Sequence, residues 1–284
     1  MLTRSLLFCP GDEREMMKKA VESGADAVIF DLEDAVAPAA HREAHRETSE
    51  FIKTLDDPDP SISVRINPLN RGGRQDINAV VQNAGSLPNS VVLPKSDSAE
   101  SVETLSSHLS SVDAESVDII PLIETADGLM SAEEIATAPG VVAIAYGDQD
   151  YTADVGATVT DEKVESLFSR QRIVATAEAA GIDALDTVYT SIDDADGLQK
   201  QVEMIITFGF DGKLAIHPTQ VDVINDAFTP NLDEIEWAET VIEGQRQAIE
   251  AETGVFTVDG QMIDPPLIER ARTILDRATA AGIR

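Results

Sequence analysis

The sequence predicts a (β/α)8 barrel, the TIM-barrel fold, and three observations point to it. Short apolar runs that are too brief for buried helices recur along the chain. The segments between them carry apolar residues at helical spacing, such as Val102, Leu105 and Leu109. The length of 284 residues accommodates one such barrel, and the 43% hydrophobic content supports a full core. Strands and helices that alternate in this way form a parallel sheet, with the active site at the carboxyl ends of the strands.

Eight runs qualify as strands, and the seventh has the weakest pattern because it is short. The predicted strands are Ser5–Cys9, Ala27–Asp31, Ser63–Ile66, Ser90–Leu93, Asp118–Ile123, Val141–Tyr146, Ala184–Asp186 and Lys213–Ile216. One helix-length segment, Ala126 to Ala138, separates the fifth strand from the sixth.

A C-terminal helical extension is expected after the barrel. We assign residues 1–229 to the barrel and 230–284 to the extension. The extension should contain one helix from about Asn231 to Glu252 and a last helix that ends near Ala281. The stretch between them, Thr253 to Pro266, is predicted to have no regular secondary structure. A barrel does not need this stretch, which makes it a candidate lid or subunit-exchange arm.

The net charge of −31 is spread along the whole chain. It argues against nucleic-acid binding, which needs a basic surface. An acidic surface of this size suits concentrated salt, where repulsion between carboxylates is screened. We therefore expect a protein from an extreme halophile; the alternative is an ordinary acidic cytoplasmic protein.

Several features point to the cytoplasm. No apolar stretch reaches the roughly 20 residues needed to cross a bilayer. Charged residues such as Arg4 and Asp12 interrupt the amino terminus, so it lacks a signal-peptide pattern. The single cysteine, Cys9, cannot form an internal disulfide, which fits a reducing compartment. We expect neither a membrane nor a nucleic acid as partner.

Two carboxylates mark the expected site. Glu124 follows the fifth strand, and Asp150 follows the sixth within Gly147-Asp148-Gln149-Asp150. Neighbouring parallel strands bring them to one edge of the sheet, roughly 5 Å apart or a little more. Carboxylates that close repel each other unless a cation lies between them, and we expect Mg²⁺, with Mn²⁺ as a substitute. The alternative is a solvated strand end or a helix cap.

Other strand ends add charged groups to the same edge. Glu33 and Asp34 follow the second strand, Arg65 lies in the third, and Lys95 follows the fourth. Because all strands of a barrel end at one mouth, these acidic and basic side chains should converge there.

The blocks at these strand ends resemble one known family, the HpcH/HpaI aldolase and citrate lyase β-subunit superfamily, in its acyl-CoA lyase branch. The blocks run in order from Arg4 to the last helix. They are Arg4-Ser5 with Pro10-Gly11, Asp31-Leu32-Glu33-Asp34-Ala35-Val36, Val64-Arg65-Ile66-Asn67, Leu93-Pro94-Lys95, Pro121-Leu122-Ile123-Glu124-Thr125, Gly147-Asp148-Gln149-Asp150, Ile216-His217-Pro218-Thr219-Gln220-Val221 and Met262-Ile263-Asp264.

The resemblance implies a trimeric or hexameric (β/α)8 enzyme that binds Mg²⁺ and a CoA thioester. Such enzymes cleave or form the carbon–carbon bond of a 3-hydroxy-3-carboxyacyl-CoA, so an acyl-CoA and a 2-oxoacid are the expected small-molecule partners. Glu124 and Asp150 match the family's metal ligands, and Arg65 matches its substrate-binding arginine. Asp264 matches an aspartate on a C-terminal lid that reaches a neighbouring subunit's site in related lyases.

Each residue is given a chemical role. Arg65 can stabilise negative charge on the thioester oxygen, or serve as a structural partner of the acidic mouth. Glu33 and Asp34 can bond metal-bound waters or orient Arg65, although a simple surface role for one of them is an alternative. Gln149 is assigned to substrate binding beside Asp150. Asp264 is the candidate acid or base; the alternative is a helix N-cap, since two prolines follow it.

Basic residues are scarce, so four of them are candidates for CoA phosphates: Arg4, Lys95, Arg14 and Lys19. Lys18 and Lys19 also fit the solvated face of a helix. His41 and His45 are four positions apart, a spacing that permits metal binding, but they read as surface residues without a third ligand. His217 could contact CoA or a metal-bound water, but a lone histidine before proline is more often structural. Cys9 fits packing.

The predicted function is a Mg²⁺-dependent acyl-CoA lyase. The first choice of substrate is malyl-CoA or β-methylmalyl-CoA, which gives glyoxylate plus acetyl-CoA or propionyl-CoA. The nearest rival is a citryl- or citramalyl-thioester lyase. A non-catalytic CoA-binding subunit of a lyase complex and a malyl-CoA thioesterase are further alternatives.

Overall fold

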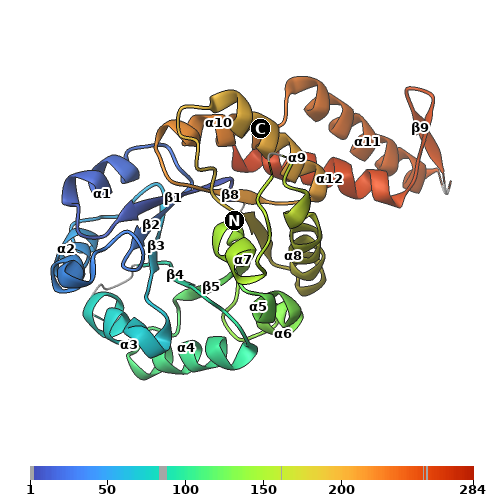
Figure 1. The fold of residues 1–284 in the computed structure, drawn as a ribbon. Coiled ribbons are helices and arrows are strands. Elements are labelled where there is room, and N and C mark those ends of the chain that lie inside the picture. Colours follow the sequence, from blue (N-terminus) through green and yellow to red (C-terminus); the bar gives the residue numbers. More distant parts are fainter. Residues whose placement is uncertain (1–2, 83–87, 161, 252, 254) are drawn as a thin grey trace. The chain divides into compact units, whose positions relative to one another are not determined.

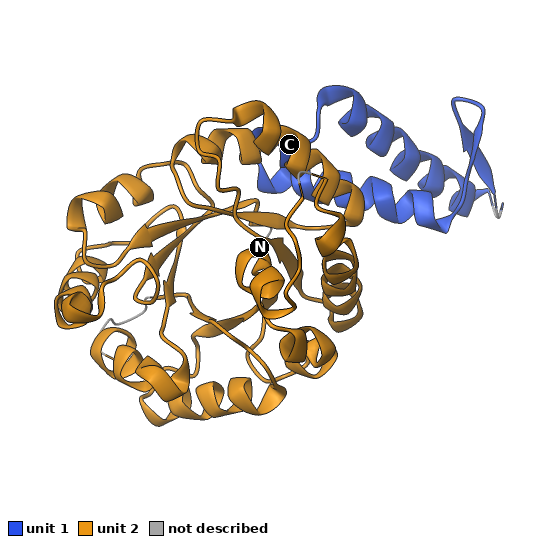
Figure 2. Ribbon diagram, viewed as in Figure 1, with its two compact units in different colours: residues 1–2, 226–284 blue, residues 3–225 orange. Residues whose placement is uncertain are grey.

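The computed structural model describes residues 3–82, 88–160, 162–251, 253 and 255–284. The chain divides into two compact units (Figure 2). Residues 3–225 form the larger unit, and residues 226–284 belong to the smaller one. The division falls inside helix α10, Thr219–Phe228, a few residues before the predicted boundary at 229.

The larger unit is a closed barrel (Figure 1). In the described part of the chain, eight parallel strands pair in sequence order, and the last pairs with the first. They are β1 Ser5–Pro10, β2 Ala27–Asp31, β3 Ser61–Arg65, β4 Ser90–Leu93, β5 Asp118–Ile123, β6 Ala143–Tyr146, β7 Asp183–Asp186 and β8 Gly212–Ala215. The predicted (β/α)8 fold is confirmed, including the short seventh strand.

Alternate residues of these strands fill the inside of the barrel. One cluster of buried side chains collects Ala27 and Ile29 from β2, Ile120 and Leu122 from β5, and residues from five of the other strands. Side chains two positions apart point to the same face of a strand, so each strand contributes alternate residues to this core. The inside of the barrel is therefore a packed core and not an open channel.

Helices alternate with the strands around the barrel (Figure 1). The longer ones bury an apolar face, as α4 does with Val102, Leu105 and Leu109. The helices of this unit are α1 Arg14–Val21, α2 His41–Ile52, α3 Gly73–Asp76, α4 Ala99–Ser111, α5 Ala126–Met130, α6 Ala132–Ala136, α7 Asp148–Asp154, α8 Leu167–Ala180, α9 Ala195–Phe208 and α10. Short turns of 3-10 or π helix lie at Pro38–Ala40, Leu69–Arg71, Ile77–Val81 and Val164–Ser166.

The expectation of one helix over Ala126–Ala138 is wrong. Two short helices, α5 and α6, meet at Ser131, whose φ of −95° and ψ of 6° end the first helix. Gly128 explains part of the local geometry: a Cβ there would lie 2.4 Å from the carbonyl oxygen of Ser96. The first helix therefore begins against the backbone after β4.

The smaller unit is a helical hairpin with a short β-ribbon. It contains α11 Leu232–Glu250, β9 Phe256–Val258, β10 Gln261–Ile263 and α12 Pro265–Ala280. A capping box between Asn231 and Glu234 starts α11. Apolar side chains of both helices, such as Val241 and Ala271, pack in one core with residues of the ribbon. No helix in the described ranges is long and apolar enough to span a bilayer.

The stretch predicted to be irregular, 253–266, therefore holds an antiparallel hairpin. Asp259 and Gly260 form its two-residue loop, with φ values of 51° and 79°. An Asp-Gly pair between short strands is typical of such turns, because both central residues need positive φ. That signal was present in the sequence.

Candidate active site

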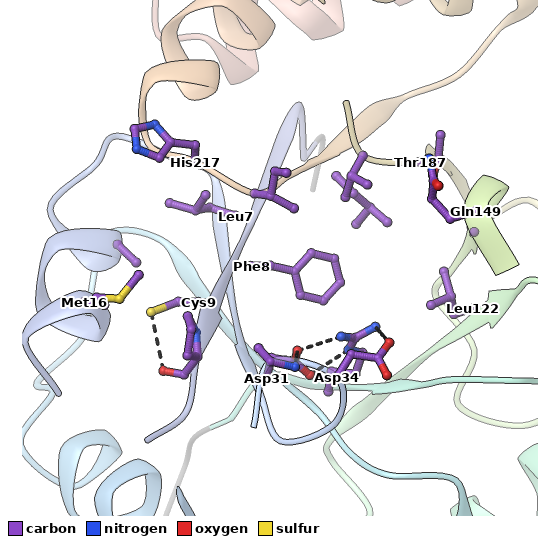
Figure 3. A pocket seen from close by; sticks show the side chains of 18 of the residues that line it. Leu7, Phe8, Cys9, Met16, Asp31, Asp34, Leu122, Gln149, Thr187 and His217 are labelled. Carbon is purple, nitrogen blue, oxygen red and sulfur yellow. Dashed lines mark hydrogen bonds and ion pairs between the residues drawn. The ribbon is translucent and has the colours of Figure 1, made fainter. Parts of the chain in front are cut away.

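A cavity of about 790 Å³ opens at the carboxyl ends of the barrel strands (Figure 3). This volume lies in the range of small-molecule sites. Residues in or after seven of the eight strands line it, and apolar side chains such as Leu7, Phe8 and Leu122 form much of its wall. Its polar lining includes Lys19, Asp31, Asp34, Arg65, Glu124, Gln149, Asp150, Thr187 and His217.

Glu124 is held tightly at the end of β5. Its side chain is almost fully buried, and Oε1 accepts a hydrogen bond of 2.7 Å from the backbone N–H of Lys95. Burial raises the pKa of Glu124 to about 7, against the opposing effects of the Lys95 hydrogen bond and charge. A Cβ at Gly147 would lie 2.7 Å from Cβ and 2.8 Å from Oε2 of Glu124, so only glycine fits beside it.

Asp150 lies in the first turn of α7 and shares one cation with Glu124. The Lys95 ammonium lies 2.9 Å from Asp150 Oδ1 and 3.9 Å from Glu124 Oε1. Lys95 adopts a φ of 48°, an unusual conformation for a side-chain-bearing residue. Its ammonium is thus engaged by two carboxylates, which differs from the expectation that it contacts a CoA phosphate.

These two carboxylates suit a hard divalent cation. Mg²⁺ is bound in proteins by one or two carboxylates and keeps several waters. No group of three or more His, Cys, Asp and Glu side chains with metal-binding geometry occurs among the residues that the structure describes. Glu124 and Asp150 stay the predicted donors, and the Lys95 ammonium shows that one positive charge can bridge them.

Arg65 is fixed at the end of β3 by Asp31, the last residue of β2. The register of the two strands pairs these residues. Arg65 Nε donates to Asp31 Oδ1 at 2.7 Å, and Nη2 donates to Oδ2 at 2.6 Å. The guanidinium also lies 4.8 Å from the centre of the Phe8 ring. Burial disfavours the charge of Arg65, but the Asp31 hydrogen bonds outweigh it and raise the pKa, so Arg65 stays charged.

Sequence reasoning did not assign a role to Asp31. The signal that could have identified it is positional, because it ends the strand next to the one that carries Arg65. Only 2% of its side chain is exposed, and it also accepts hydrogen bonds from the backbone N–H groups of Glu33 and Ala35. Asp31 thus fixes both Arg65 and the loop after β2.

Glu33 and Asp34 lie on the other side of Arg65. Carboxylate oxygens of Glu33 and Asp34 are 3.3 Å and 3.6 Å from Arg65 Nη1. Burial, against the charge of Arg65, raises the pKa of Glu33 to about 8. Asp34 is exposed at the rim. A carboxylic acid that keeps its proton near neutral pH can donate it. The catalytic role of Glu33 stays a prediction.

Lys19 and Gln149 line the cavity. Its lining does not include the other three candidates for CoA phosphates, Arg4, Arg14 and Lys95, or Glu33. Arg14 lies over the Phe51 ring, with its Nη1 3.7 Å from Glu47. Arg4 precedes β1, at the amino-terminal end of the barrel, and its guanidinium pairs with Asp26 at 2.7 Å. The expectation that Arg4 serves this cavity is wrong, because the cavity opens at the opposite end of the strands.

Asp264 lies in the smaller unit and caps α12. Its Oδ1 accepts a hydrogen bond of 3.3 Å from the N–H of Leu267, and Pro265 occupies the first helical position. The N-cap interpretation is therefore confirmed, and a catalytic role for Asp264 stays a prediction.

Three other residues singled out from the sequence, His45, His217 and Cys9, have defined surroundings. His45 is partly buried, with Nε2 2.6 Å from Asp76 Oδ1, so it is not a simple surface residue. His217 lines the cavity and lies 2.8 Å, through Nδ1, from Thr219 Oγ1. Burial and the nearby carboxylate of Asp31 raise the pKa of Cys9 to about 12, so its thiol stays protonated and packs against the cavity.

Comparison with known proteins identifies the family. The family model of HpcH/HpaI aldolase/citrate lyase matches residues 4–218. The mitochondrial citramalyl-CoA lyase of Mus musculus is 34% identical over 292 residues, which cover 98% of this chain and 86% of that protein. The citrate lyase subunit beta of Leuconostoc mesenteroides subsp. cremoris is 35% identical over 287 residues, which cover 98% and 94%.

Solved structures agree with this assignment. The protein CitE from Mycobacterium tuberculosis, in complex with magnesium, acetoacetate and coenzyme A, superposes with a TM-score of 0.81 and 33% identity over 98% of both chains. RipC from Yersinia pestis superposes with a TM-score of 0.70 and 35% identity over 82% of this chain. With the family model matched over most of the barrel, this chain belongs to the HpcH/HpaI aldolase/citrate lyase family.

Proposed function

We propose that this protein is a Mg²⁺-dependent carbon–carbon lyase that cleaves or forms a 3-hydroxy-3-carboxyacyl-CoA. The observation that carries the proposal is the pair Glu124 and Asp150, which the Lys95 ammonium bridges. The pair lies in one cavity with Arg65, which Asp31 holds in place. The relatives support it, since they are named citramalyl-CoA lyase and citrate lyase subunit beta. A similar structure holds magnesium, acetoacetate and coenzyme A.

Glu124 and Asp150 would hold the metal. Bound Mg²⁺ supplies a Lewis acid that orients a 2-oxoacid and polarises its oxygen atoms. The burial of Glu124 and the glycine beside it fix one ligand, and α7 carries the other. A rigid pair of this kind limits how the oxoacid can bind.

Arg65 would stabilise the other fragment of the substrate. When the carbon–carbon bond breaks, negative charge develops on the thioester oxygen of the departing enolate. Asp31 uses two of the five N–H donors of Arg65 and fixes the guanidinium, so the other donors are preorganised. The apolar wall, which includes Leu122 and Leu214, reduces the water around this charge.

Proton transfer to or from the enolate carbon needs an acid or base. We propose Asp264 for this step, on the strength of the sequence match, and Glu33 as a proton carrier beside Arg65. Lys19, at the edge of the cavity, is the proposed contact for a CoA phosphate. A homotrimer or homohexamer in the cytoplasm completes the proposal.

The substrate is chosen from four thioesters. The sequence favours malyl-CoA or β-methylmalyl-CoA, whereas the names of the relatives favour citramalyl-CoA or a citryl thioester. We place citramalyl-CoA first in the test because a relative of that name is 34% identical over nearly the whole chain.

The test is a cleavage assay of the four thioesters with Mg²⁺, with and without a chelator, in which the released oxoacid is identified. We expect chelator-sensitive release of pyruvate, glyoxylate or oxaloacetate with the matching acyl-CoA. Asp150→Asn should abolish this activity, whereas Asp154→Asn is the matched control. Asp154 lies on the same helix, but it accepts a hydrogen bond from the N–H of Ala126 and does not line the cavity.

Three results would contradict the proposal. Free CoA together with malate would indicate a thioesterase. Turnover only after partner chains are added would indicate a subunit of a lyase complex. Equal activity of Asp150→Asn and wild type would exclude the metal site proposed here.

A further inference from the structure

A group of buried charges lies between β6, β7, β8 and α8, outside the cavity wall. Asp148, Arg170, Asp186 and Lys213 are each at most 2% exposed. None of the four lines the cavity that holds Glu124 and Asp150. Charged side chains are rarely buried this completely, so their presence calls for a physical reason.

The charges form a connected network. Lys213 Nζ donates to Asp186 Oδ2 at 2.7 Å, and Arg170 Nε donates to Asp186 Oδ1 at 2.7 Å. Burial opposes ionisation of Asp186, but the Lys213 ammonium and the Arg170 guanidinium outweigh it and hold the pKa below its ordinary value. Lys213 Nζ also donates to the carbonyl oxygen of Thr187 at 2.6 Å.

The network ends at Asp148, the first residue of α7. Asp148 Oδ1 accepts hydrogen bonds from the hydroxyls of Tyr146, at 3.2 Å, and Ser166. Its Oδ2 lies 3.4 Å from Lys163 Nζ and 3.9 Å from Arg170 Nη2. The backbone N–H of Asp148 donates to Thr187 Oγ1 at 3.1 Å. Both the carboxylate and the backbone of Asp148 are therefore fixed.

Stability alone does not explain this arrangement. Apolar residues of similar volume often stabilise a protein as well as a buried ion pair does, or better. Within the described ranges, neither Nη1 nor Nη2 of Arg170 has a hydrogen-bond partner, so part of the network is left unsatisfied. Its position suggests another purpose, because Gln149 and Asp150 follow Asp148 directly in the first turn of α7.

We propose that Asp148 and Arg170, held by Asp186 and Lys213, are positioning residues that fix the turn 147–150 and so set the Asp150 carboxylate opposite Glu124. The four residues act through this turn and do not touch the substrate. The inference rests on the proposed function, since it takes Asp150 as a metal ligand. Outer partners that orient metal ligands typically change metal affinity by about 10–100-fold when they are removed.

The test measures Mn²⁺ binding to the whole purified protein by electron paramagnetic resonance of the free ion, together with thermal unfolding. Asp148→Asn keeps the size of the side chain and removes its charge. We expect Mn²⁺ to bind about 10–100-fold more weakly than to wild type. Lyase activity of this variant should recover as the Mg²⁺ concentration is raised, which a general loss of structure would not produce.

Asp26→Asn is the matched control. It also removes the charge of an aspartate that pairs with an arginine, Arg4, but this aspartate is only partly buried and lies at the amino-terminal end of the barrel. We expect this control to unfold at a lower temperature than wild type and to bind Mn²⁺ with wild-type affinity. If Asp148→Asn does not fold, Ser166→Ala removes one hydrogen bond to the same carboxylate and should weaken Mn²⁺ binding in the same direction.

The outcomes separate the two proposals. Wild-type protein that binds no Mn²⁺ would overturn the proposed metal site and this inference with it. Wild-type protein that binds Mn²⁺, with unchanged affinity in Asp148→Asn or Ser166→Ala, would overturn only the positioning role.

Discussion

Replacing Gly147 by alanine should disable the site without removing a charged group. Gly147 follows β6, and the register that pairs Ile123 with Tyr146 brings it beside Glu124. The added methyl group would lie 2.7 Å from Cβ and 2.8 Å from Oε2 of Glu124. The Cβ of Glu124 is attached to the backbone directly after β5, so it cannot rotate away as a side-chain tip could.

The size of the effect follows from these distances. Ordinary contact begins at 3.4 Å, so residue 124 or residue 147 must shift by about 0.7 Å. Binding and catalytic groups need to be placed within about 0.5 Å, and a displacement of about 1 Å can cost 100-fold. We expect Gly147→Ala to lower kcat/KM and Mn²⁺ affinity by about 10–100-fold. The overpacking should cost about 1–3 kcal/mol in the free energy of unfolding.

The assays are Mn²⁺ titration, thioester cleavage and denaturant unfolding, with Gly244→Ala as the matched control. A Cβ at Gly244 would lie 2.7 Å from the Phe256 ring, a similar clash within the smaller unit. Because the Phe256 ring can rotate, this control should lose no more stability than Gly147→Ala, and it should keep its Mn²⁺ affinity. Equal Mn²⁺ affinity in Gly147→Ala and wild type would refute the argument that this glycine fixes the metal ligand.

Three further predictions concern charge. Burial raises the pKa of Glu33 from 4.5 to about 8 in the folded protein. Between pH 4.5 and about pH 8, Glu33 therefore keeps its proton in the folded protein and loses it in the unfolded chain. Stability should therefore fall as pH rises through this window, by up to about 1.4 kcal/mol per pH unit, and denaturant unfolding of Glu33→Gln should show a flatter profile. Asp31→Asn should lower the free energy of unfolding by about 3 kcal/mol. This is near the low end for a broken buried ion pair, because Asp34 stays near Arg65. A loss below about 1 kcal/mol would contradict this prediction. With a net charge of −31, the unfolding temperature should rise from about 0.1 M to about 2 M KCl, and no rise would argue against a halophilic protein.

The fold was largely predictable because its signal is repeated. Eight apolar runs, each followed by a helical pattern, leave few alternatives to a barrel, even where one run is as short as β7. Two local features were missed. The break at Ser131 has no proline or glycine at the position itself to signal it. The hairpin at Asp259-Gly260 had a local signal, the Asp-Gly pair, that was overlooked.

The candidate site was predictable only in part. Residues that end strands, such as Glu124 and Arg65, could be placed at the mouth because strand ends share one edge. The direction of a side chain was not available: Lys95 turns toward two carboxylates through a φ of 48°. Arg4 precedes β1, so it lies at the amino-terminal end of the barrel, away from the cavity. The scarcity of basic residues in the sequence therefore did not indicate where this arginine lies.

Two residues without an assigned chemical role account for much of the geometry of this site. Asp31 fixes Arg65 because the β2–β3 register pairs them, and Gly147 admits Glu124 because the β5–β6 register places them side by side. Both effects depend on strand pairing, so a shift of either register by one residue would separate these contacts and turn the side chains to the other face of the sheet. The barrel therefore does more than carry the loops of the site. Its strand registers bring the fixed arginine and the buried carboxylate to the same cavity. The arginine is held there by the charge of Asp31, and the carboxylate fits because Gly147 has no Cβ.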